Sequence, residues 1–225
     1  MRLFPIAKQG LPYIIGLAVV SVLFVLLSWT FMAALTLLAT LLVINFFRDP
    51  DRVIPQVPDA VVAPADGKII FAARAYEDRF LNKETLKVSI FMNIFNVHVN
   101  RIPFSGEVES IHYEKGTFLA ANSDKASLNN EQNAIVLRTP GGEKIVFVQI
   151  AGLVARRIDC WLRPGESVRR GERFGMIRFG SRLDVFLPND SRLAVDKGHH
   201  VKAGESIICY QPVRKENEEP RNHDS

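Results

Sequence analysis

The chain has few cysteines and lacks the short motifs that mark several common enzyme classes. Its 225 residues include only two cysteines, Cys160 and Cys209, whose spacing predicts neither a disulfide framework nor a zinc site. There is no Walker loop, dinucleotide fingerprint, HExxH zinc helix or Gly-x-Ser-x-Gly elbow. The sequence therefore predicts no metal site and argues against the usual nucleotide-binding, zinc-protease and serine-hydrolase folds.

Charge is also absent from a long stretch near the N-terminus, from Gln9 to Phe47. As a single helix, Tyr13–Phe47 would be roughly 50 Å long at about 1.5 Å per residue. A bilayer core is only about 30 Å thick. Because Ser28-Trp29-Thr30 interrupts the run near its middle, we predict a hairpin of two short helices, Ile14–Leu27 and Phe31–Ile44. The lengths leave open whether this hairpin spans the bilayer or only dips into it.

Basic residues flank the apolar stretch at both ends and indicate its orientation. Arg2 and Lys8 precede it, and Arg48 and Arg52 follow it. A hairpin puts both ends on one side, which the positive-inside tendency makes cytoplasmic. The run is much longer than the apolar core of a cleaved signal peptide. The net charge of +4 suits an anionic lipid surface, and nucleic acid is the weaker alternative.

The chain divides into four parts. Residues 1–48 form the predicted anchoring hairpin, and residues 49–59, with three prolines, form a stiff linker. Residues 60–210 form the main domain. The last residues, 211–225, are mostly charged or polar and are predicted to be disordered.

The main domain has β patterns throughout. Leu86–Ile90 alternates between apolar and polar residues. In a second predicted strand, Leu183, Val185 and Leu187 alternate with Arg182, Asp184 and Phe186. Two apolar, β-branched runs, Ala134–Arg138 and Lys144–Ile150, surround Thr139-Pro140-Gly141-Gly142, which predicts a hairpin turn.

A weak internal repeat refines the fold class. Pro164–Glu172 resembles Lys197–Glu205, and each has a glycine, a short strand with a central valine, and a Gly-Glu pair. Such Gly-spaced short strands predict a mainly β domain, a compact sandwich or barrel with a hybrid character like that of biotinyl or lipoyl carriers. The apolar helical hairpin precedes this domain.

Three residues could carry chemistry, each with a plainer alternative. Asp66 lies in an Asp-Gly sequence typical of turns. His98 can move protons near neutral pH, but the pattern alone favours a core or hydrogen-bonded histidine. Ser181 follows Gly180 at a predicted strand junction and matters only if a base activates its hydroxyl. An Asp66–His98–Ser181 relay is compatible with this order, although sequence alone does not establish contact.

Several ordered motifs together resemble one family, the short bacterial phosphatidylserine decarboxylases. The resemblance covers roughly residues 48–210 and includes the apolar N-terminus. The matching stretches are Pro64–Gly67, Val97–Arg101, Asp124–Ser127, Gln149–Ile158 and Gly171–Pro188.

The resemblance implies a proenzyme that cuts itself between Gly180 and Ser181. The Ser181 hydroxyl attacks the Gly180 carbonyl, giving a β chain of residues 1–180 and an α chain of residues 181–225. The new N-terminus becomes a pyruvoyl group, which forms a Schiff base with phosphatidylserine and acts as the electron sink when carbon dioxide leaves. His98 is implied as the base for cleavage and as a proton donor, and Asp66 as the residue that orients His98.

The resemblance also implies partners and a location. The substrate is a membrane phospholipid, the α and β chains form a heterodimer, and a higher oligomer stays open. Nucleic acid is not an implied partner. The site lies at the cytoplasmic face of the bacterial inner membrane. Arginine pairs well with phosphate oxygens, so the candidates for the lipid phosphate are Arg101, Arg156, Arg157 and Arg182.

Three alternatives compete with this hypothesis. The same chemistry on archaetidylserine would need the same head-group contacts. A membrane-anchored carrier or adaptor domain would need a displayed lysine, but Lys197 and Lys202 do not lie in a recognisable carrier tetrapeptide. An inactive lipid-holding scaffold would have no use for the Gly180-Ser181 pair together with Asp66 and His98.

Overall fold

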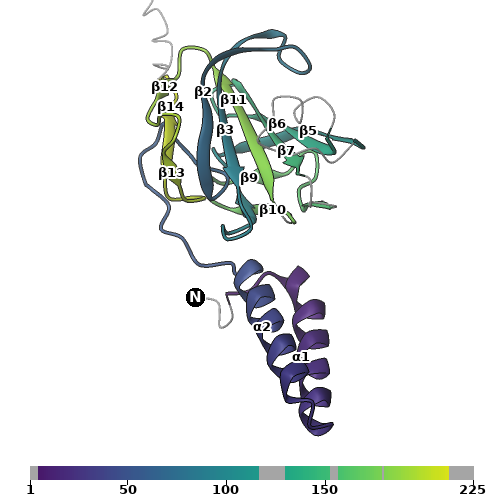
Figure 1. Cartoon of the computed structure of the whole chain (residues 1–225). Coiled ribbons are helices and arrows are strands. Elements are labelled where there is room, and N and C mark those ends of the chain that lie inside the picture. Colours follow the sequence, from purple (N-terminus) through teal and green to yellow (C-terminus); the bar gives the residue numbers. More distant parts are fainter. Residues whose placement is uncertain (1–4, 117–129, 153–156, 179, 213–225) are drawn as a thin grey trace, which may run out of the picture.

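A computed structural model of the chain has two apolar helices that project from one end of a β-rich domain (Figure 1). It describes residues 5–116, 130–152, 157–178 and 180–212. The predicted disorder of the tail concerns residues that lie almost entirely outside this part of the chain, and so does the Asp124–Ser127 motif. The mainly β fold with an N-terminal helical pair confirms the predicted fold class.

The charge-free stretch forms the two helices of the predicted hairpin. A short 3-10 turn, η1 (Lys8–Gly10), leads into α1 (Leu11–Leu26), and α2 (Thr30–Phe46) follows after a tight turn. Ser28 closes this turn with a φ of 59°. Three helix hydroxyls bond to a carbonyl four residues earlier, which satisfies them within their own helix: Ser21, Thr36 and Thr40.

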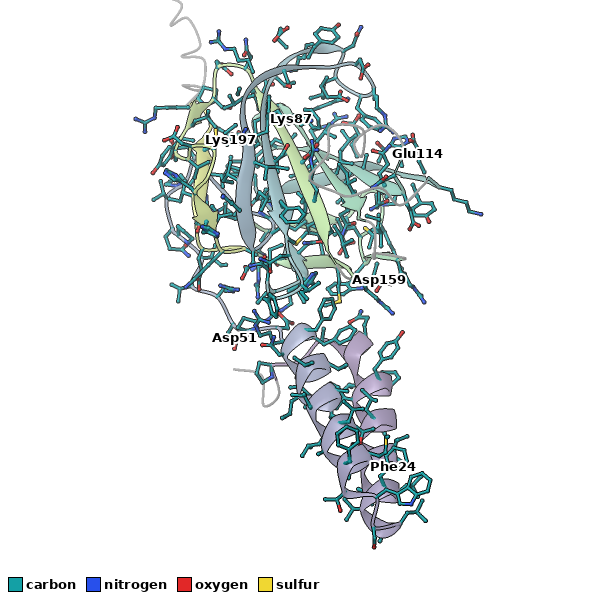
Figure 2. The ribbon with its side chains drawn as sticks, in the orientation of Figure 1. Phe24, Asp51, Lys87, Glu114, Asp159 and Lys197 are labelled. Atoms are coloured by element: carbon teal, nitrogen blue, oxygen red, sulfur yellow. The ribbon has the colours of Figure 1, made fainter. Side chains whose placement is uncertain are left out.

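Most apolar side chains of the hairpin have no protein cover. Leu26 and Phe31, at the tip, are 74% and 75% exposed. Phe24 lies near the same tip, far from the domain (Figure 2). Lys8–Leu26 is long and apolar enough to cross a membrane by length and composition, and Thr30–Phe46 is a shorter apolar helix. An apolar surface of this extent favours contact with lipid.

The domain is built on a curled antiparallel sheet with the strand order β13-β2-β3-β11-β7-β6-β5-β9. Its strands are β2 (Gly67–Glu77), β3 (Lys83–Met92), β5 (Gly106–Glu114), β6 (Gln132–Arg138), β7 (Lys144–Ala151), β9 (Ser167–Val168), β11 (Ser181–Pro188) and β13 (His200–Val201). The predicted β6–β7 hairpin is confirmed. Leu183 and Val185 face the main core, whereas Phe186 packs in a second cluster.

Two small antiparallel sheets complete the domain. The first has the order β1-β14-β12, from Ala60–Val62, Ile207–Tyr210 and Arg192–Leu193. The second has the order β4-β10-β8, from Val99–Arg101, Arg173–Ile177 and Ile158–Cys160. The second sheet matters for function because β4 follows His98 directly and β10 leads to Gly180 and Ser181.

The internal repeat forms the two edges of the main sheet. Its short strands are β9 and β13, the first and last strands in the sheet order. Gly171 and Gly204 occupy equivalent places in the two repeats and have φ values of 83° and 77°. A Cβ atom at position 171 would lie 2.3 Å from Ile54 Cδ1, and one at position 204 would lie 2.9 Å from Arg101 Cδ and 3.0 Å from Ile54 Cδ1. Glycine therefore allows both repeats to approach the same residue of the 49–59 segment.

The predicted linker, residues 49–59, is bound to the domain along its length. Arg170 donates hydrogen bonds to the carbonyls of Pro55 and Val57, at 2.7 and 2.6 Å. Arg101 donates to the Pro50 carbonyl at 2.9 Å. Arg173 forms an ion pair of 2.7 Å with the buried Asp49. These bonds fix the place where the chain passes from helix α2 to the domain.

Candidate functional site

The Gly180–Ser181 junction lies where the chain enters the middle of the main sheet. Ser181 is the first residue of β11 and pairs with Met92 of β3 and Ala151 of β7. Gly180 has a φ of 65°, a conformation that glycine adopts at little cost. Ser181 is fully buried, and its Oγ lies 3.8 Å from the Met92 sulfur, a weak acceptor. This contact is too weak to hold the hydroxyl firmly away from a reaction at Gly180.

His98 is buried beneath the domain end of helix α2. The Phe46 ring lies over the imidazole, with centroids 4.1 Å apart. Neither ring nitrogen has a hydrogen-bond partner among the described residues. Burial lowers the pKa of His98 to about 4. A nearby Asn96 backbone group, whose geometry is too poor for a hydrogen bond, opposes this shift, and the Arg48 charge adds to it. His98 is therefore neutral at pH 7, the form that can accept a proton.

Asp66 belongs to a separate, well-paired cluster. Both carboxylate oxygens accept hydrogen bonds from Arg52 Nη2, at 3.0 and 2.8 Å. The backbone N–H of Ala203 donates to Oδ1 at 2.7 Å, and Arg52 also pairs with Glu205. Since the nitrogens of His98 have no partner, the structure does not bring Asp66 and His98 into the predicted contact. The orienting role of Asp66 stays a prediction that requires a rearrangement.

Arg101, predicted to bind phosphate, has an internal role in this conformation. Its side chain is 6% exposed and donates to the carbonyls of Pro50 and Gly171, each at 2.9 Å. It also pairs with Asp49 at 3.5 Å. Burial, with the neighbouring charge of Arg173, lowers the pKa of Arg101 to about 10, so it stays charged at neutral pH. Through these contacts, the charged Arg101 side chain holds the segment that begins at Asp49 against the domain.

Arg182 lies on the face of β11 opposite Ser181, because successive strand residues point to opposite faces. Its Nε and Nη2 donate to Asp184, at 2.6 and 2.8 Å. Lys87 pairs with the same carboxylate at 3.0 Å and lies well away from the helices (Figure 2). Arg182 is therefore not aimed at the Ser181 side of the strand.

Arg157 is the most accessible of the candidate arginines that the structure describes. Its side chain is 68% exposed and pairs with Asp159 at 3.1 Å. Asp159 lies at the end of the domain that meets the helices (Figure 2). It also pairs with Arg178, which donates to the Tyr13 hydroxyl of α1 at 3.1 Å. The fourth candidate, Arg156, lies outside the described residues.

Neither cysteine is a reactive nucleophile in this conformation. Cys160 and Cys209 are free thiols. Burial raises the pKa of Cys209 to about 12 and also raises that of Cys160, so neither thiol is ionised at neutral pH. In the part of the chain that the structure describes, no group of three or more His, Cys, Asp or Glu could hold a metal ion.

Two features of the site were not predicted from the sequence. Phe46 covers His98 although it belongs to the helical hairpin, and no local pattern signals a contact across such a separation. Asn100 and Gln149 lie within the motifs that carried the resemblance, yet they were not singled out as site residues. Both are fully buried. For Gln149, a polar residue within the apolar run of β7 was the available signal.

Comparison with known proteins gives a consistent result. The family model for phosphatidylserine decarboxylase matches residues 39–209. This range includes the Gly180–Ser181 junction, His98 and Asp66. It also includes the last part of helix α2, Ala39–Phe46, which contributes Phe46.

Curated relatives match over nearly their whole length. A phosphatidylserine decarboxylase proenzyme of Syntrophus aciditrophicus is 52% identical over 204 residues, covering 90% of this chain and 96% of the relative. The proenzyme of Desulfotalea psychrophila is 47% identical, covering 91% and 95%. The proenzyme of Cupriavidus metallidurans is 47% identical over 211 residues, covering 93% and 96%.

Proposed function

Because the chain belongs to the phosphatidylserine decarboxylase family, we propose that it converts phosphatidylserine to phosphatidylethanolamine and carbon dioxide after cutting itself between Gly180 and Ser181. The relatives carry the name proenzyme, which implies a processed chain. Family membership does not favour a carrier domain, an inactive scaffold or an archaetidylserine enzyme. The observation that carries the proposal is the buried Ser181 hydroxyl behind a left-handed Gly180.

The cleavage chemistry uses groups that the chain supplies. Ser181 Oγ attacks the Gly180 carbonyl carbon and gives its proton to a base, for which we propose His98. The peptide C–N bond then breaks, the nitrogen takes a proton, and Gly180 is left as an ester on Ser181 Oγ. Removal of the α-proton of residue 181 breaks the Cβ–Oγ bond and releases the Gly180 carboxylate. Water replaces the nitrogen, which leaves as ammonia, and a pyruvoyl group remains.

The residues at the junction fit this product. Once formed, the pyruvoyl ketone supplies an electron sink for loss of the substrate carboxylate. The buried surroundings of Ser181 exclude bulk water, which protects a reactive carbonyl. His98 is held neutral, so it can first accept a proton and later return one to the former α-carbon of the lipid. We propose that Asp66 orients His98 after its bond with Arg52 opens.

We propose that the two products of cleavage stay together as a heterodimer. The shorter chain, residues 181–225, would contribute β11, which lies between β3 and β7 of the longer chain. It would also contribute β13, which pairs with β2, and β14, which pairs with β1. Strands interleaved in this way lose many backbone hydrogen bonds on separation.

We propose that the helical hairpin holds the site at the cytoplasmic face of the bacterial inner membrane. The charges before and after the hairpin support this orientation. The exposed Arg157 lies close to the charged cluster at the domain end nearest the helices. Among the described arginines, it is the best candidate for contact with the lipid phosphate.

An intact-mass measurement tests the proposal directly. Purified wild-type protein is expected as two fragments, with the shorter one starting at residue 181 and lacking the nitrogen of its first residue. It should release carbon dioxide from phosphatidylserine vesicles. Ser181→Ala is expected to remain one uncut, inactive chain because it lacks the nucleophile. Ser167→Ala, at an exposed position, is the serine control and should be cut normally. A wild-type preparation that stays uncut would refute the proposal.

A further inference from the structure

A row of three buried side-chain amides ends beside the Ser181 hydroxyl. Asn133 comes from β6, Gln149 from β7 and Asn100 from β4, and each is at most 2% exposed. Asn133 Nδ2 donates to Gln149 Oε1 at 3.1 Å. Gln149 Nε2 donates to Asn100 Oδ1 at 2.9 Å. Three separate strands therefore supply one connected row of hydrogen bonds.

The row has a direction, which fixes how Asn100 is oriented. Since Asn133 donates to the Gln149 oxygen, the Gln149 nitrogen must face Asn100. Gln149 in turn occupies the Asn100 oxygen, so the Asn100 NH₂ group points the other way, toward the Met92 sulfur at 3.8 Å. Ser181 Oγ lies 3.8 Å from the same sulfur. The Asn100 NH₂ group and the Ser181 hydroxyl therefore both contact the Met92 sulfur.

The fit around Gln149 is close. A side chain at position 175 would lie 3.0 Å from Gln149 Nε2 and would collide with the Asp159 carbonyl. Gly175 therefore leaves the space that the middle amide of the row occupies. The same residue lies on β10, the strand that leads to the Gly180–Ser181 junction.

The terminal N–H group of this row has a poor partner. Thioether sulfur is a weak acceptor, and a buried donor without a good partner costs about 1–3 kcal/mol. An apolar residue at position 100 would avoid this cost. The three amides instead place a weakly bonded N–H group beside a reactive hydroxyl. This arrangement suggests that the N–H donates to a stronger acceptor that forms during the reaction.

We propose that Asn100 donates this N–H to the oxygen of the Gly180 carbonyl as Ser181 attacks it, and that Gln149 and Asn133 are positioning residues that fix its orientation. The attack turns the carbonyl oxygen into an oxyanion, a far stronger acceptor than the Met92 sulfur. The bond therefore strengthens as the reaction proceeds, which is what accelerates it. This inference rests on the proposed self-cleavage at residues 180 and 181.

Asn100→Asp tests the donor role by replacing the NH₂ group at nearly constant shape. At pH 8 we expect cleavage to be about 10²-fold slower, as when one oxyanion donor is lost. Burial raises the pKa of a carboxyl group, so the new side chain should take up a proton as the pH falls toward 5. Its O–H then replaces the lost donor. Cleavage of the variant should therefore speed up on acidification, whereas that of the wild type should not.

Two further variants keep the test decisive. Gln149→Met keeps the volume but frees Asn100 to rotate, and we expect about tenfold slower cleavage. Thr85→Val is the control: Thr85 is fully buried, and its hydroxyl donates to the Ala75 carbonyl near the end of β3 opposite Met92. It should be cut at the wild-type rate. Each variant is also made with Ser181→Ala, and its thermal unfolding reports whether the uncut chain folds.

The outcomes separate this inference from the proposed function. An uncut wild-type chain would refute the function itself. A cut wild type with Asn100→Asp cut equally fast at pH 8 would overturn only the role of Asn100. A folded Asn100→Asp chain that stays slow at every pH would also overturn it. If Asn100→Asp does not fold, Gln149→Met decides, and a wild-type rate from the folded variant would overturn the inference.

Discussion

Asp66 and His98 are both buried, yet their surroundings differ sharply. Asp66 has an ion pair with Arg52 at 2.8 Å and a backbone N–H donor. His98 has no hydrogen-bond partner among the described residues and an aromatic ring above it. The Asp66 carboxylate is fully paired, whereas the burial of the His98 imidazole costs folding free energy that no hydrogen bond offsets. An uncompensated buried polar group of this kind is a feature of functional sites.

The contrast separates two kinds of contribution. The pairing of Asp66 should stabilise the folded chain, because breaking a buried ion pair leaves an unpaired charge. The isolation of His98 should lower stability but keep the imidazole neutral and reactive. Substitution of Asp66 should therefore mainly lower the unfolding free energy, whereas substitution of His98 should mainly lower the cleavage rate.

His98→Leu is expected to give the largest effect. Loss of the base should slow self-cleavage by about 10²–10⁴-fold, as measured by the appearance of the two fragments on a gel. Stability should not fall, because the substitution removes two unpaired polar atoms from a buried place. Chemical unfolding in the Ser181→Ala background measures this. A large loss of stability would show that His98 is mainly structural.

The same variant also tests the pKa of His98. The folded pKa of about 4 lies below the unfolded value of 6.5, so the unfolded chain binds more protons between these values. Stability should therefore fall as the pH drops from 6.5 to 4, by up to about 3 kcal/mol at about 1.4 kcal/mol per unit of pKa. With His98→Leu, this part of the pH dependence should disappear.

Asp66→Asn is expected to act mainly on stability. Arg52 would keep only its longer pair with Glu205, at 3.3 Å, so the cost should lie below the roughly 3–5 kcal/mol of a fully broken buried pair. If Asp66 also orients His98 after leaving Arg52, cleavage of the folded fraction should slow as well. Arg52→Gln is the matched variant, since it loosens the same pair but keeps the Asp66 carboxylate. It should be cut at close to the wild-type rate, and an equal slowing in both variants would argue against the orienting role.

Phe46→Ala should give the smallest effect, a shift in pH dependence. Opening the cover over His98 lets water reach the ring, so its pKa should rise from about 4 toward 6.5. Only the neutral imidazole accepts a proton, so cleavage slows on acidification. In the variant this slowing should begin at a pH about one to two units higher than in the wild type. At pH 8 the two rates should nearly agree. Phe31→Ala, at the exposed hairpin tip, should leave the pH profile unchanged.

Much of the fold could be predicted from the sequence because local patterns determine it. The helical hairpin followed from an uncharged run too long for one span, and the β6–β7 hairpin from two β-branched runs around Pro140 and Gly141. The internal repeat predicted short strands around Val168 and Val201, which are present. Their place at opposite edges of one sheet could not be predicted, since it depends on long-range pairing.

The site was harder to predict because its contacts join distant segments. Ser181 and His98 came from motifs, but the partner of Asp66 is Arg52 in the preceding segment. The cover of His98 comes from a helix that was predicted to serve only as an anchor. Arg182 could have been placed correctly, because strand alternation alone puts it on the face opposite Ser181.

The arginine bonds to residues 49–59 have a consequence for how the enzyme meets its substrate. A loose tether would let the domain reach away from its own bilayer and sample a facing membrane. Here Arg170 and Arg101 fasten the segment to the domain surface, and Arg173 holds Asp49 at its start. With the hairpin in the membrane, as proposed, the catalytic domain works at a fixed height. It then meets lipids of its own leaflet as they diffuse laterally past it.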